Sequence, residues 1–216
     1  MGISILSRRA CGLLLLGLPG LAWGQQPGRV RPIVVLLGAP GAGKTTQAEF
    51  LKRKYGIPAI SMSSLLKAEV GRRSSLGKKL KIALESGTLV NDQMMNDLVL
   101  LRLERKDTEA GFVLDGYPMN AAQAQFLDNL AKERGFPAPL IIELRVPDSV
   151  ATQRLNRRGR ADDKPRIIEQ RISEYHQDIG ALLDHWKDRN LHIIDGTQKP
   201  DTISEQIDKL VAVLGR

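Results

Sequence analysis

The sequence predicts an α/β fold, in which a five-stranded parallel sheet forms the middle of a three-layer sandwich. Five apolar segments recur along the 216-residue chain, and helical patterns separate them. Each segment is apolar throughout rather than at alternate positions, which is typical of strands buried on both faces of a parallel sheet. The alternation of strands and helices indicates a doubly wound layer. The expected strands are residues 33–37, 57–60, 112–114, 140–146 and 191–194.

The first expected strand is followed by a glycine-rich segment from Gly38 to Thr46 and by a helical pattern over 47–55. This segment has the complete pattern G-x-x-x-x-G-K-[ST] between a strand and a helix, as a phosphate-binding loop requires. Its backbone N–H groups and the helix N-terminus would face a polyphosphate, and Lys44 would add a mobile charge. A turn without a ligand needs no lysine and two hydroxyls beside its glycines. The segment therefore predicts a bound nucleoside triphosphate.

The chain between the second and third strands is predicted to be helical. Helical patterns over 63–70 and 76–85 indicate a small insertion without a strand. A longer helix is expected over 91–106, with Asn91 or Asp92 as its cap.

The third strand ends in the segment Asp115-Gly116-Tyr117-Pro118. An acid at the end of a buried strand, beside the phosphate-binding loop, is suited to hold Mg²⁺ or its waters. The alternative is that Asp115 only caps the next turn. The metal role is favoured because a bound triphosphate needs a cation. A helix over 121–134 is expected to follow.

Four arginines lie within seven residues around the end of a helix expected over 149–157: Arg154, Arg157, Arg158 and Arg160. Such a cluster is costly unless anions meet it, and the transfer of a phosphoryl group needs positive charge around the transferring oxygens. Arg171, near the start of a helix expected over 164–187, could point back to the same site. Asp162 and Asp163 would cap that helix, orient the arginines, or both. A final helix is expected over 200–214.

The first 24 residues have the three parts of a secretory signal peptide. Arg8-Arg9 precedes an apolar run over 10–18, and small residues lead to a cleavage site after Gly24. The apolar run is too short to span a membrane comfortably. We therefore expect an exported or periplasmic protein whose residues 25–216 form one domain. The alternative is a true start near Val30 and a cytoplasmic protein.

Charge and cysteine usage restrict the partners. The formal net charge is +8, and loss of the two arginines of the signal peptide leaves +6. Basic and acidic residues are interspersed and aromatic residues make up 4%, so no nucleic-acid partner is expected. The only cysteine, Cys11, lies in the signal peptide, which leaves the mature chain without a disulfide or a thiolate metal site. No stable membrane association is expected after cleavage.

Taken together, these motifs resemble those of the adenylate kinase family of nucleoside monophosphate kinases. The resemblance runs from about Arg31 to the C-terminus. It implies a P-loop kinase fold with a helical monophosphate-binding insertion at 60–90 and a minimal lid at 154–163. The motifs that carry it are the segment 38–46, the turn 115–118, Gln123, the segment 160–163, Arg171 and the turn 195–197.

The resemblance implies transfer of the γ-phosphoryl group of ATP to AMP, with Mg²⁺ as the cofactor and with ATP and AMP as partners of a monomer. The implied catalytic residues are Lys44, Asp115, Arg158, Arg160 and Arg171. Thr45 and Asp115 would hold the metal, partly through water. The implied ATP-binding residues are Gly41, Ala42, Gly43, Lys44, Thr45, Thr46, Arg154, Arg158 and Lys199. The implied AMP-binding residues are Met62, Lys67, Leu89, Val90, Gly116, Tyr117, Pro118, Met119, Gln123, Arg160 and Arg171, with Gln123 bonded to adenine.

The chain departs from the family pattern mainly on the acceptor side. Lys67 and Met119 stand where the family has arginines that hold the acceptor phosphate, and Ser64 replaces an aspartate. Lysine keeps the charge but loses the bidentate fork. On the donor side, Thr45 replaces a glycine and supplies a hydroxyl that could touch Mg²⁺. We therefore expect measurable activity that is weaker than the family norm.

Two other functions stay open at this point. A kinase for a different nucleotide or small metabolite fits the altered acceptor residues, although Gln123 favours adenine. An exported nucleotide-binding protein with vestigial catalysis fits the leader. The retained lysine, aspartate and arginines argue against a pure binder, which would not need the whole arginine set.

Overall fold

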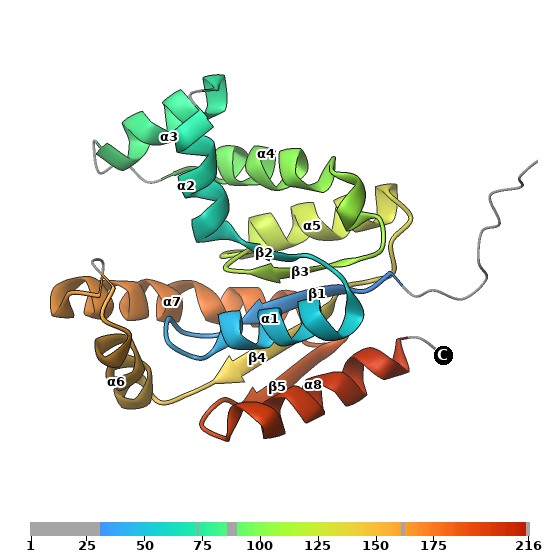
Figure 1. Cartoon of the computed structure of the whole chain (residues 1–216), viewed down its shortest axis with the longest axis vertical. Helices are drawn as coiled ribbons and strands as arrows, with labels where there is room; N and C mark the ends of the chain where they lie inside the picture. Colours follow the sequence, from blue (N-terminus) through green and yellow to red (C-terminus); the bar gives the residue numbers. More distant parts are fainter. Residues whose placement is uncertain (1–30, 73, 86–89, 161–162, 215–216) are drawn as a thin grey trace, which may run out of the picture.

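The structure, a computed structural model, describes residues 31–72, 74–85, 90–160 and 163–214. Its five strands form one parallel sheet in the order β2-β3-β1-β4-β5 (Figure 1). The predicted five-stranded parallel sheet is therefore confirmed. The strands are β1 (Ile33–Leu37), β2 (Ala59–Ser61), β3 (Phe112–Asp115), β4 (Leu140–Arg145) and β5 (Leu191–Asp195).

The central strand, β1, shows why its residues favour a sheet covered on both sides. All five of its side chains are buried. Because successive side chains of a strand point to opposite faces, Ile33, Val35 and Leu37 join one hydrophobic cluster. Val34 and Leu36 join the cluster on the other face. The continuous apolar run is thus shared between two cores.

Helices cover both faces of the sheet and complete the three layers. On one face lie α4 (Asp92–Leu103), α5 (Ala121–Glu133) and α7 (Pro165–Trp186), which bury residues such as Leu127 and Leu182. On the other face lie α1 (Lys44–Tyr55) and α8 (Pro200–Val213), which bury Leu51 and Ile207. Figure 1 shows these helices running along the sheet.

Two helices, α2 (Met62–Arg72) and α3 (Ser75–Glu85), follow β2 directly and stand beside the sheet rather than against it (Figure 1). They occupy the region where the sequence predicts a helical insertion. Buried Glu69 of α2 ties the end of that helix to the residue before α3. Its carboxylate accepts hydrogen bonds from Arg72 Nη1 at 3.4 Å and from Ser74 Oγ. Ser74 Oγ in turn accepts from the N–H of Gly77 at 2.8 Å.

Two helix boundaries differ from expectation by three residues: α1 begins at Lys44 rather than at 47, and α4 ends before 106. Asn91 caps the start of α4, as predicted, by accepting from the Met94 N–H at 2.9 Å. The helix ends at Leu103, not at 106, and a 3₁₀ turn, η1 (Lys106–Thr108), follows. The hydroxyl of buried Thr108 donates to the carbonyls of Leu103 and Arg105 and holds this turn.

Near the carboxyl ends of the strands, α6 (Asp148–Arg158) packs against α7 through Leu155, Ile168 and Ile172. The predicted signal peptide over 1–24 and the expected site or lid residues Leu89, Ala161 and Asp162 lie outside the described residues. Within the part of the chain that the structure describes, no helix combines the length and apolar character needed to cross a membrane.

Candidate active site

The glycine-rich segment links the central strand β1 to α1, as the sequence predicts. It lies at the carboxyl edge of the sheet, where ligands of open parallel sheets bind. Lys44 folds back over the segment, and its Nζ donates to the carbonyls of Gly38 at 2.6 Å and Ala39 at 3.0 Å. The ammonium group is therefore held above the loop at the N-terminus of α1.

Charged side chains from three other segments act on the ammonium group of Lys44. Burial lowers the pKa of its ammonium group, the carboxylate of Asp115 opposes this shift, and the charges of Arg171 and Arg158 lower the pKa further. These residues come from the loop, β3, α6 and α7, so the fold has brought four distant segments within electrostatic reach. An anion bound here would relieve the repulsion among the three cations.

Asp115 ends β3 and faces the start of α1. The register of β3 on β1 pairs Asp115 with Leu36, two residues before the loop. The Thr45 hydroxyl donates to Asp115 Oδ2 at 2.7 Å, and Asp115 is 9% exposed. A hydroxyl and a carboxylate side by side are the hard oxygen ligands that suit Mg²⁺. This donor pair fits the expected metal, with waters and phosphate oxygens as the remaining ligands.

Asp163, in the segment that follows α6, contacts three of the arginines: Arg158, Arg160 and Arg171. Its carboxylate accepts two hydrogen bonds from the Arg158 guanidinium, at 2.9 and 2.6 Å, and the Arg160 backbone N–H donates to it at 3.0 Å. Arg171 Nη1 lies 4.0 Å from the same carboxylate. These contacts, led by the Arg158 hydrogen bonds, lower the pKa of Asp163 to about 2. Of the two roles predicted for this aspartate, orienting the arginines is the one these contacts perform.

The remaining donor-side residues lie on the other flank of the loop. Arg154 Nη1 donates to the carbonyl of Ala42 at 3.3 Å. Gly196 lies against the same carbonyl, because a Cβ built on it would approach the Ala42 oxygen to 3.3 Å. Lys199 is exposed and precedes α8 as its N-cap residue.

The acceptor-side residues surround the turn after β3. Tyr117 is 1% exposed, and its hydroxyl donates to Asn96 Oδ1 at 2.6 Å. Gln123, at the start of α5, is 3% exposed, and its Oε1 accepts from the Met119 N–H at 2.8 Å. The Met119 side chain, in contrast, is 51% exposed. Met62 is buried at the start of α2, while Lys67 is exposed on that helix and Val90 is half-buried before α4.

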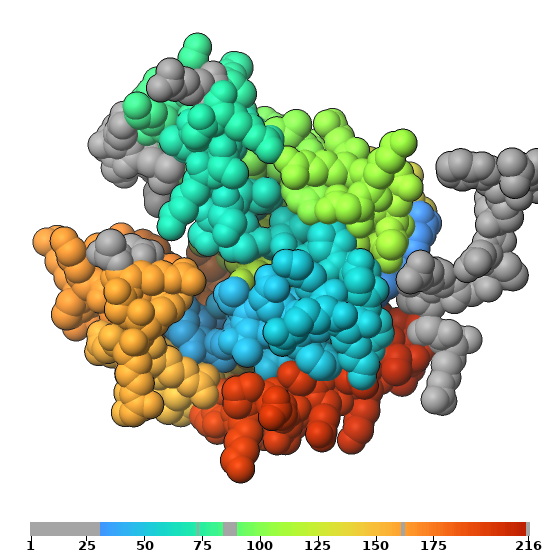
Figure 2. All heavy atoms as spheres, viewed as in Figure 1, coloured from blue at the N-terminus to red at the C-terminus, as the bar shows by residue number. Residues whose placement is uncertain are grey.

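A hollow separates the insertion from the arginine-bearing helices. Figure 2 shows α2 and α3 on one side of it and α6 with the start of α7 on the other, with the blue segment that contains the loop at its edge. Met62 and Lys67 belong to the first pair of helices, and Arg158 and Arg171 belong to the second.

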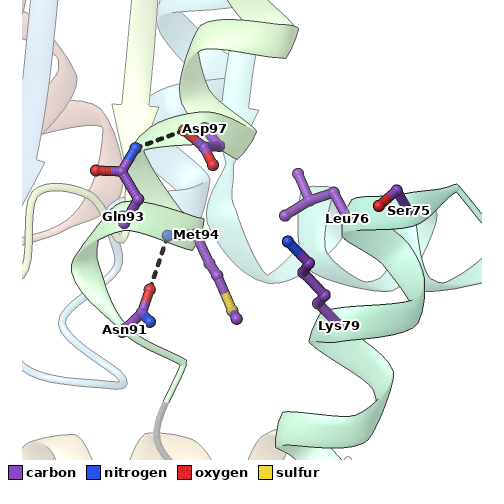
Figure 3. Close-up of a pocket in the computed structure, with 7 residues that line it drawn as sticks. All are labelled: Ser75, Leu76, Lys79, Asn91, Gln93, Met94 and Asp97. Carbon is purple, nitrogen blue, oxygen red and sulfur yellow. Dashed lines mark hydrogen bonds between the residues drawn. The ribbon is translucent and has the colours of Figure 1, made fainter.

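A second hollow, of about 410 Å³, lies between α3 and α4 (Figure 3). Leu76 and Lys79 point from α3 toward α4, and Met94 points into the space between the two helices. Among the described residues that line it, none is expected to hold a phosphate. We therefore assign the phosphate chemistry to the glycine-rich loop and not to this space.

Two residues of the site escaped the sequence prediction. The sequence predicts Asp92 only as a possible helix cap, yet its Oδ1 accepts from Gln123 Nε2 at 2.6 Å. Asn120 caps α5 by accepting from the Gln123 N–H at 2.9 Å and also donates to Asp92 Oδ1 at 2.9 Å. Asparagine just before a helical pattern is a recognisable capping signal for Asn120. The sequence gives no comparable signal for the contact of Asp92 with Gln123.

Comparison with known proteins shows the family of the chain. A family model described as adenylate kinase matches residues 36–191. The chain belongs to the adenylate kinase family. The adenylate kinase of Fusobacterium nucleatum is 37% identical, in an alignment that covers 82% of this chain and 97% of that protein. Adenylate kinase 1 of Synechocystis is 39% identical, with 82% and 96% covered, and the adenylate kinase of Mycobacteroides abscessus is 39% identical, with 85% and 99% covered.

As an adenylate kinase family member, the chain has all the residues expected on the donor side and two departures from the residues expected on the acceptor side. The loop, Asp115 and the arginines on α6 and α7 are all present, and the Thr45 hydroxyl of the loop donates to Asp115 at 2.7 Å. The two substituted positions, Lys67 on α2 and Met119 after β3, are both exposed in this structure. Both side chains are therefore accessible to a phosphate, and only one of them carries a charge.

Proposed function

We propose that the chain transfers the γ-phosphoryl group of Mg-ATP to AMP and forms two ADP, with lower efficiency than a family member that has both acceptor arginines. The observation that carries the proposal is geometric: Lys44 lies over the loop, Thr45 and Asp115 meet beside it at 2.7 Å, and Arg158 and Arg171 meet at Asp163. This set supplies the cations and the metal ligand that phosphoryl transfer requires. Membership in the adenylate kinase family supports ATP and AMP as the substrates.

The donor nucleotide would bind across the loop. The backbone N–H groups of Gly41 to Thr46 would hold the β- and γ-phosphates, and Lys44 would leave the loop carbonyls for the γ-phosphate. Arg154 would meet the nucleotide beside Ala42, and exposed Lys199 would contribute from the base of α8. Thr45 and Asp115 would hold Mg²⁺, which supplies charge neutralisation of the phosphates when it is bound.

The acceptor would bind between the insertion and the turn after β3. Arg160 and Arg171 would reach the phosphates of both substrates. Lys67 would give the acceptor phosphate a single point charge, since lysine lacks the fork of arginine. The base would lie near Gln123. Further contacts are proposed for Met62, Leu89, Val90, Gly116, Tyr117, Pro118 and Met119.

The transfer itself follows from these positions. An oxygen of the acceptor phosphate attacks the γ-phosphorus, and the bond to the β–γ bridging oxygen breaks so that this oxygen leaves with ADP. Charge spreads over the γ-oxygens in the transition state. Lys44, Arg158 and Arg171 would stabilise that charge, and electrostatic stabilisation of this kind is the largest single contribution in many enzymes.

A coupled assay of ADP formation tests the proposal. The purified chain with Mg-ATP should turn over AMP faster than other nucleoside monophosphates, and Lys44→Met should reduce the rate at least a hundredfold because it removes a cation from the transition state. Turnover of a different acceptor would instead favour the second candidate function, which the exposed Met119 suggests. Binding of ATP without turnover of any acceptor would contradict both.

We make two further proposals, one about the leader and one about the oligomeric state. We propose that residues 1–24 direct export and are removed after Gly24, on the strength of the basic, apolar and small-residue regions in that order. N-terminal sequencing of the mature protein should begin at Gln25, and a start near Val30 would contradict export.

We also propose a monomer without stable membrane association, which light scattering of the purified mature chain would test.

A further inference from the structure

A hydrogen-bond network ties the side chain of Gln123 to the N-termini of α4 and α5. Gln123 Nε2 donates to Asp92 Oδ1 at 2.6 Å, and Gln123 Oε1 accepts from the Met119 N–H at 2.8 Å. The same Asp92 oxygen accepts from Asn120 Nδ2 at 2.9 Å, and Asn120 Oδ1 accepts from the Gln123 N–H at 2.9 Å. Gln123 is 3% exposed, so protein groups rather than bulk water surround this carboxamide.

The two partners of the Gln123 carboxamide have fixed and opposite polarity. Asp92 Oδ1 accepts both of its hydrogen bonds here, and the Met119 backbone N–H can only donate one. If the carboxamide turned over, its NH₂ would face the N–H and its oxygen would face the carboxylate. Both hydrogen bonds would then become repulsive contacts. The chemistry of the partners, and not an arbitrary choice between oxygen and nitrogen, therefore sets the orientation.

A fixed carboxamide can distinguish two classes of purine. Adenine presents an amino donor at C6 beside the acceptor N1, whereas a 6-oxopurine presents an acceptor at C6 beside an N1–H donor. A freely rotating glutamine fits either class because it can exchange its oxygen and nitrogen. After its protein contacts, Gln123 keeps one hydrogen on Nε2 and one lone pair on Oε1. With their order fixed, these two groups match only one class.

We propose that Asp92 determines the base specificity of the acceptor by holding Gln123 in the orientation that reads adenine and rejects 6-oxopurine monophosphates. The inference rests on the proposed function, in which Gln123 meets the acceptor base. The turn that Gln123 holds begins at Asp115, whose carboxylate meets the phosphate-binding loop. Asp92 contacts Gln123 and not the substrate, so it is a positioning residue.

The test compares kcat/KM for AMP with kcat/KM for IMP and GMP, all with Mg-ATP. In Asp92→Ala, water replaces the carboxylate, and water both donates and accepts. The preference for AMP should fall about tenfold, because a charge-assisted hydrogen bond that opposes the turned carboxamide is lost. Asp92→Asn can keep an acceptor oxygen in the same place, so it should retain most of the preference. Asp92→Leu repeats the test if the alanine variant does not fold.

The matched control is Asp97→Ala. Asp97 lies on the same helix and accepts from a different glutamine, Gln93, at 2.7 Å (Figure 3). Its removal should leave the ratio of AMP to IMP unchanged. A merely structural role of Asp92 would lower kcat/KM for all acceptors by the same factor, and an unchanged ratio in Asp92→Ala would overturn the inference.

Failure of the proposed function can be told apart from failure of this inference. If the wild-type chain shows no turnover of AMP, the proposed function is wrong. Calorimetric binding of AMP and IMP to the wild type and to Asp92→Ala then tests the orientation without catalysis. Tighter binding of AMP that weakens relative to IMP in the variant supports the role of Asp92, and equal ratios contradict it.

Discussion

Met119 is the residue at which the chain's chemistry and its family pattern differ most. Its thioether side chain is 51% exposed on the turn after β3, where the resemblance places an arginine for the acceptor phosphate. The backbone N–H of the same residue donates to Gln123 Oε1 at 2.8 Å. The departure from the family pattern therefore lies in the side chain that position 119 offers to the acceptor.

Met119→Arg should raise kcat/KM for AMP by about one to two decades. The reason is that a hydrogen bond between charged groups contributes about 1.5–3 kcal/mol, and each 1.36 kcal/mol corresponds to a factor of ten. Steady-state assays of ADP formation measure the effect. Ile193→Arg is the matched control, since Ile193 is 52% exposed on β5 and gains the same charge outside the site. An equal rise in both variants would indicate general electrostatic attraction and would contradict the role of position 119.

The lowered pKa of Asp163 predicts how the stability of the fold changes with pH. Its pKa in the folded chain is about 2, below the ordinary value of 3.8, chiefly because Arg158 donates hydrogen bonds to it. A lowered pKa stabilises the folded state above pH 3.8, and this contribution is lost as the pH falls from 3.8 through about 2. The free energy of unfolding of the wild type should therefore exceed that of Asp163→Asn at neutral pH. The difference should shrink below pH 4 in urea titrations, and a constant difference down to pH 2.5 would contradict the assignment.

At the scale of elements, local pattern predicts most of what the structure contains. The apolar runs of all five strands and the glycine-rich segment are contiguous signals, so β1, the loop and α1 follow from a single stretch of sequence. The boundaries that differ depend on particular side chains. The Thr108 hydroxyl donates to the carbonyl of Leu103, the last residue of α4, and to that of Arg105 beyond it, so it satisfies the backbone where the helix ends. The strand β2 begins at Ala59, after Pro58, because proline has no N–H for a strand ladder.

Contacts between distant elements could not be predicted in the same way. Buried Glu143 on β4 accepts from the hydroxyl of Tyr175 on α7 at 3.2 Å, and Tyr175 lies one turn after Arg171. This contact fixes the helix that carries a proposed catalytic arginine. Asp128 on α5 similarly accepts from Trp186 Nε1 at 3.1 Å at the end of α7. The spacing of residues along the sequence does not predict pairs that come into contact only in the tertiary fold.

The packing of the loop against α6 yields a prediction for two glycines. Gly41 and Gly43 both have positive φ angles, of 88° and 104°. A Cβ on Gly41 would lie 2.6 Å from the Ala151 carbonyl oxygen, whereas a Cβ on Gly43 would meet nothing within 4 Å. Gly43→Ala should cost about 1–2 kcal/mol of backbone strain. Gly41→Ala should cost more, because α6 must also move.

Urea unfolding of the two alanine variants measures this difference directly. The comparison is matched, since both changes add one methyl group to the same loop at a left-handed position. Equal destabilisation would mean that α6 yields without cost and would contradict the close packing of loop and helix.

At the scale of the whole molecule, the site is formed by segments that meet only when the sheet is complete. The order β2-β3-β1-β4-β5 places the loop after the central strand, with Asp115 on one side and the strand that leads to α6 on the other. Ligands that join these segments bind the folded state alone. They should therefore stabilise the entire chain rather than one helix.

A non-hydrolysable ATP analogue with Mg²⁺, at a hundred times its dissociation constant, should stabilise the fold by about 2.7 kcal/mol. For a chain of this size that corresponds to a rise of roughly 5–10 °C in melting temperature. Differential scanning calorimetry measures the shift. Lys44→Met should lose most of it at the same ligand concentration, and an undiminished shift in this variant would place the triphosphate elsewhere.

The direction of β1 has a practical consequence for handling the protein. Its start, where Pro32 accepts from the Phe112 N–H at 2.9 Å, lies at the opposite edge of the sheet from the loop at its end. Five residues at about 3.3 Å each separate the two edges by about 16 Å. The described C-terminal helix, α8, also ends away from the loop (Figure 1). A tether joined ahead of β1, such as an affinity handle or a link to a solid support, would leave from the far edge and keep the nucleotide entrance clear.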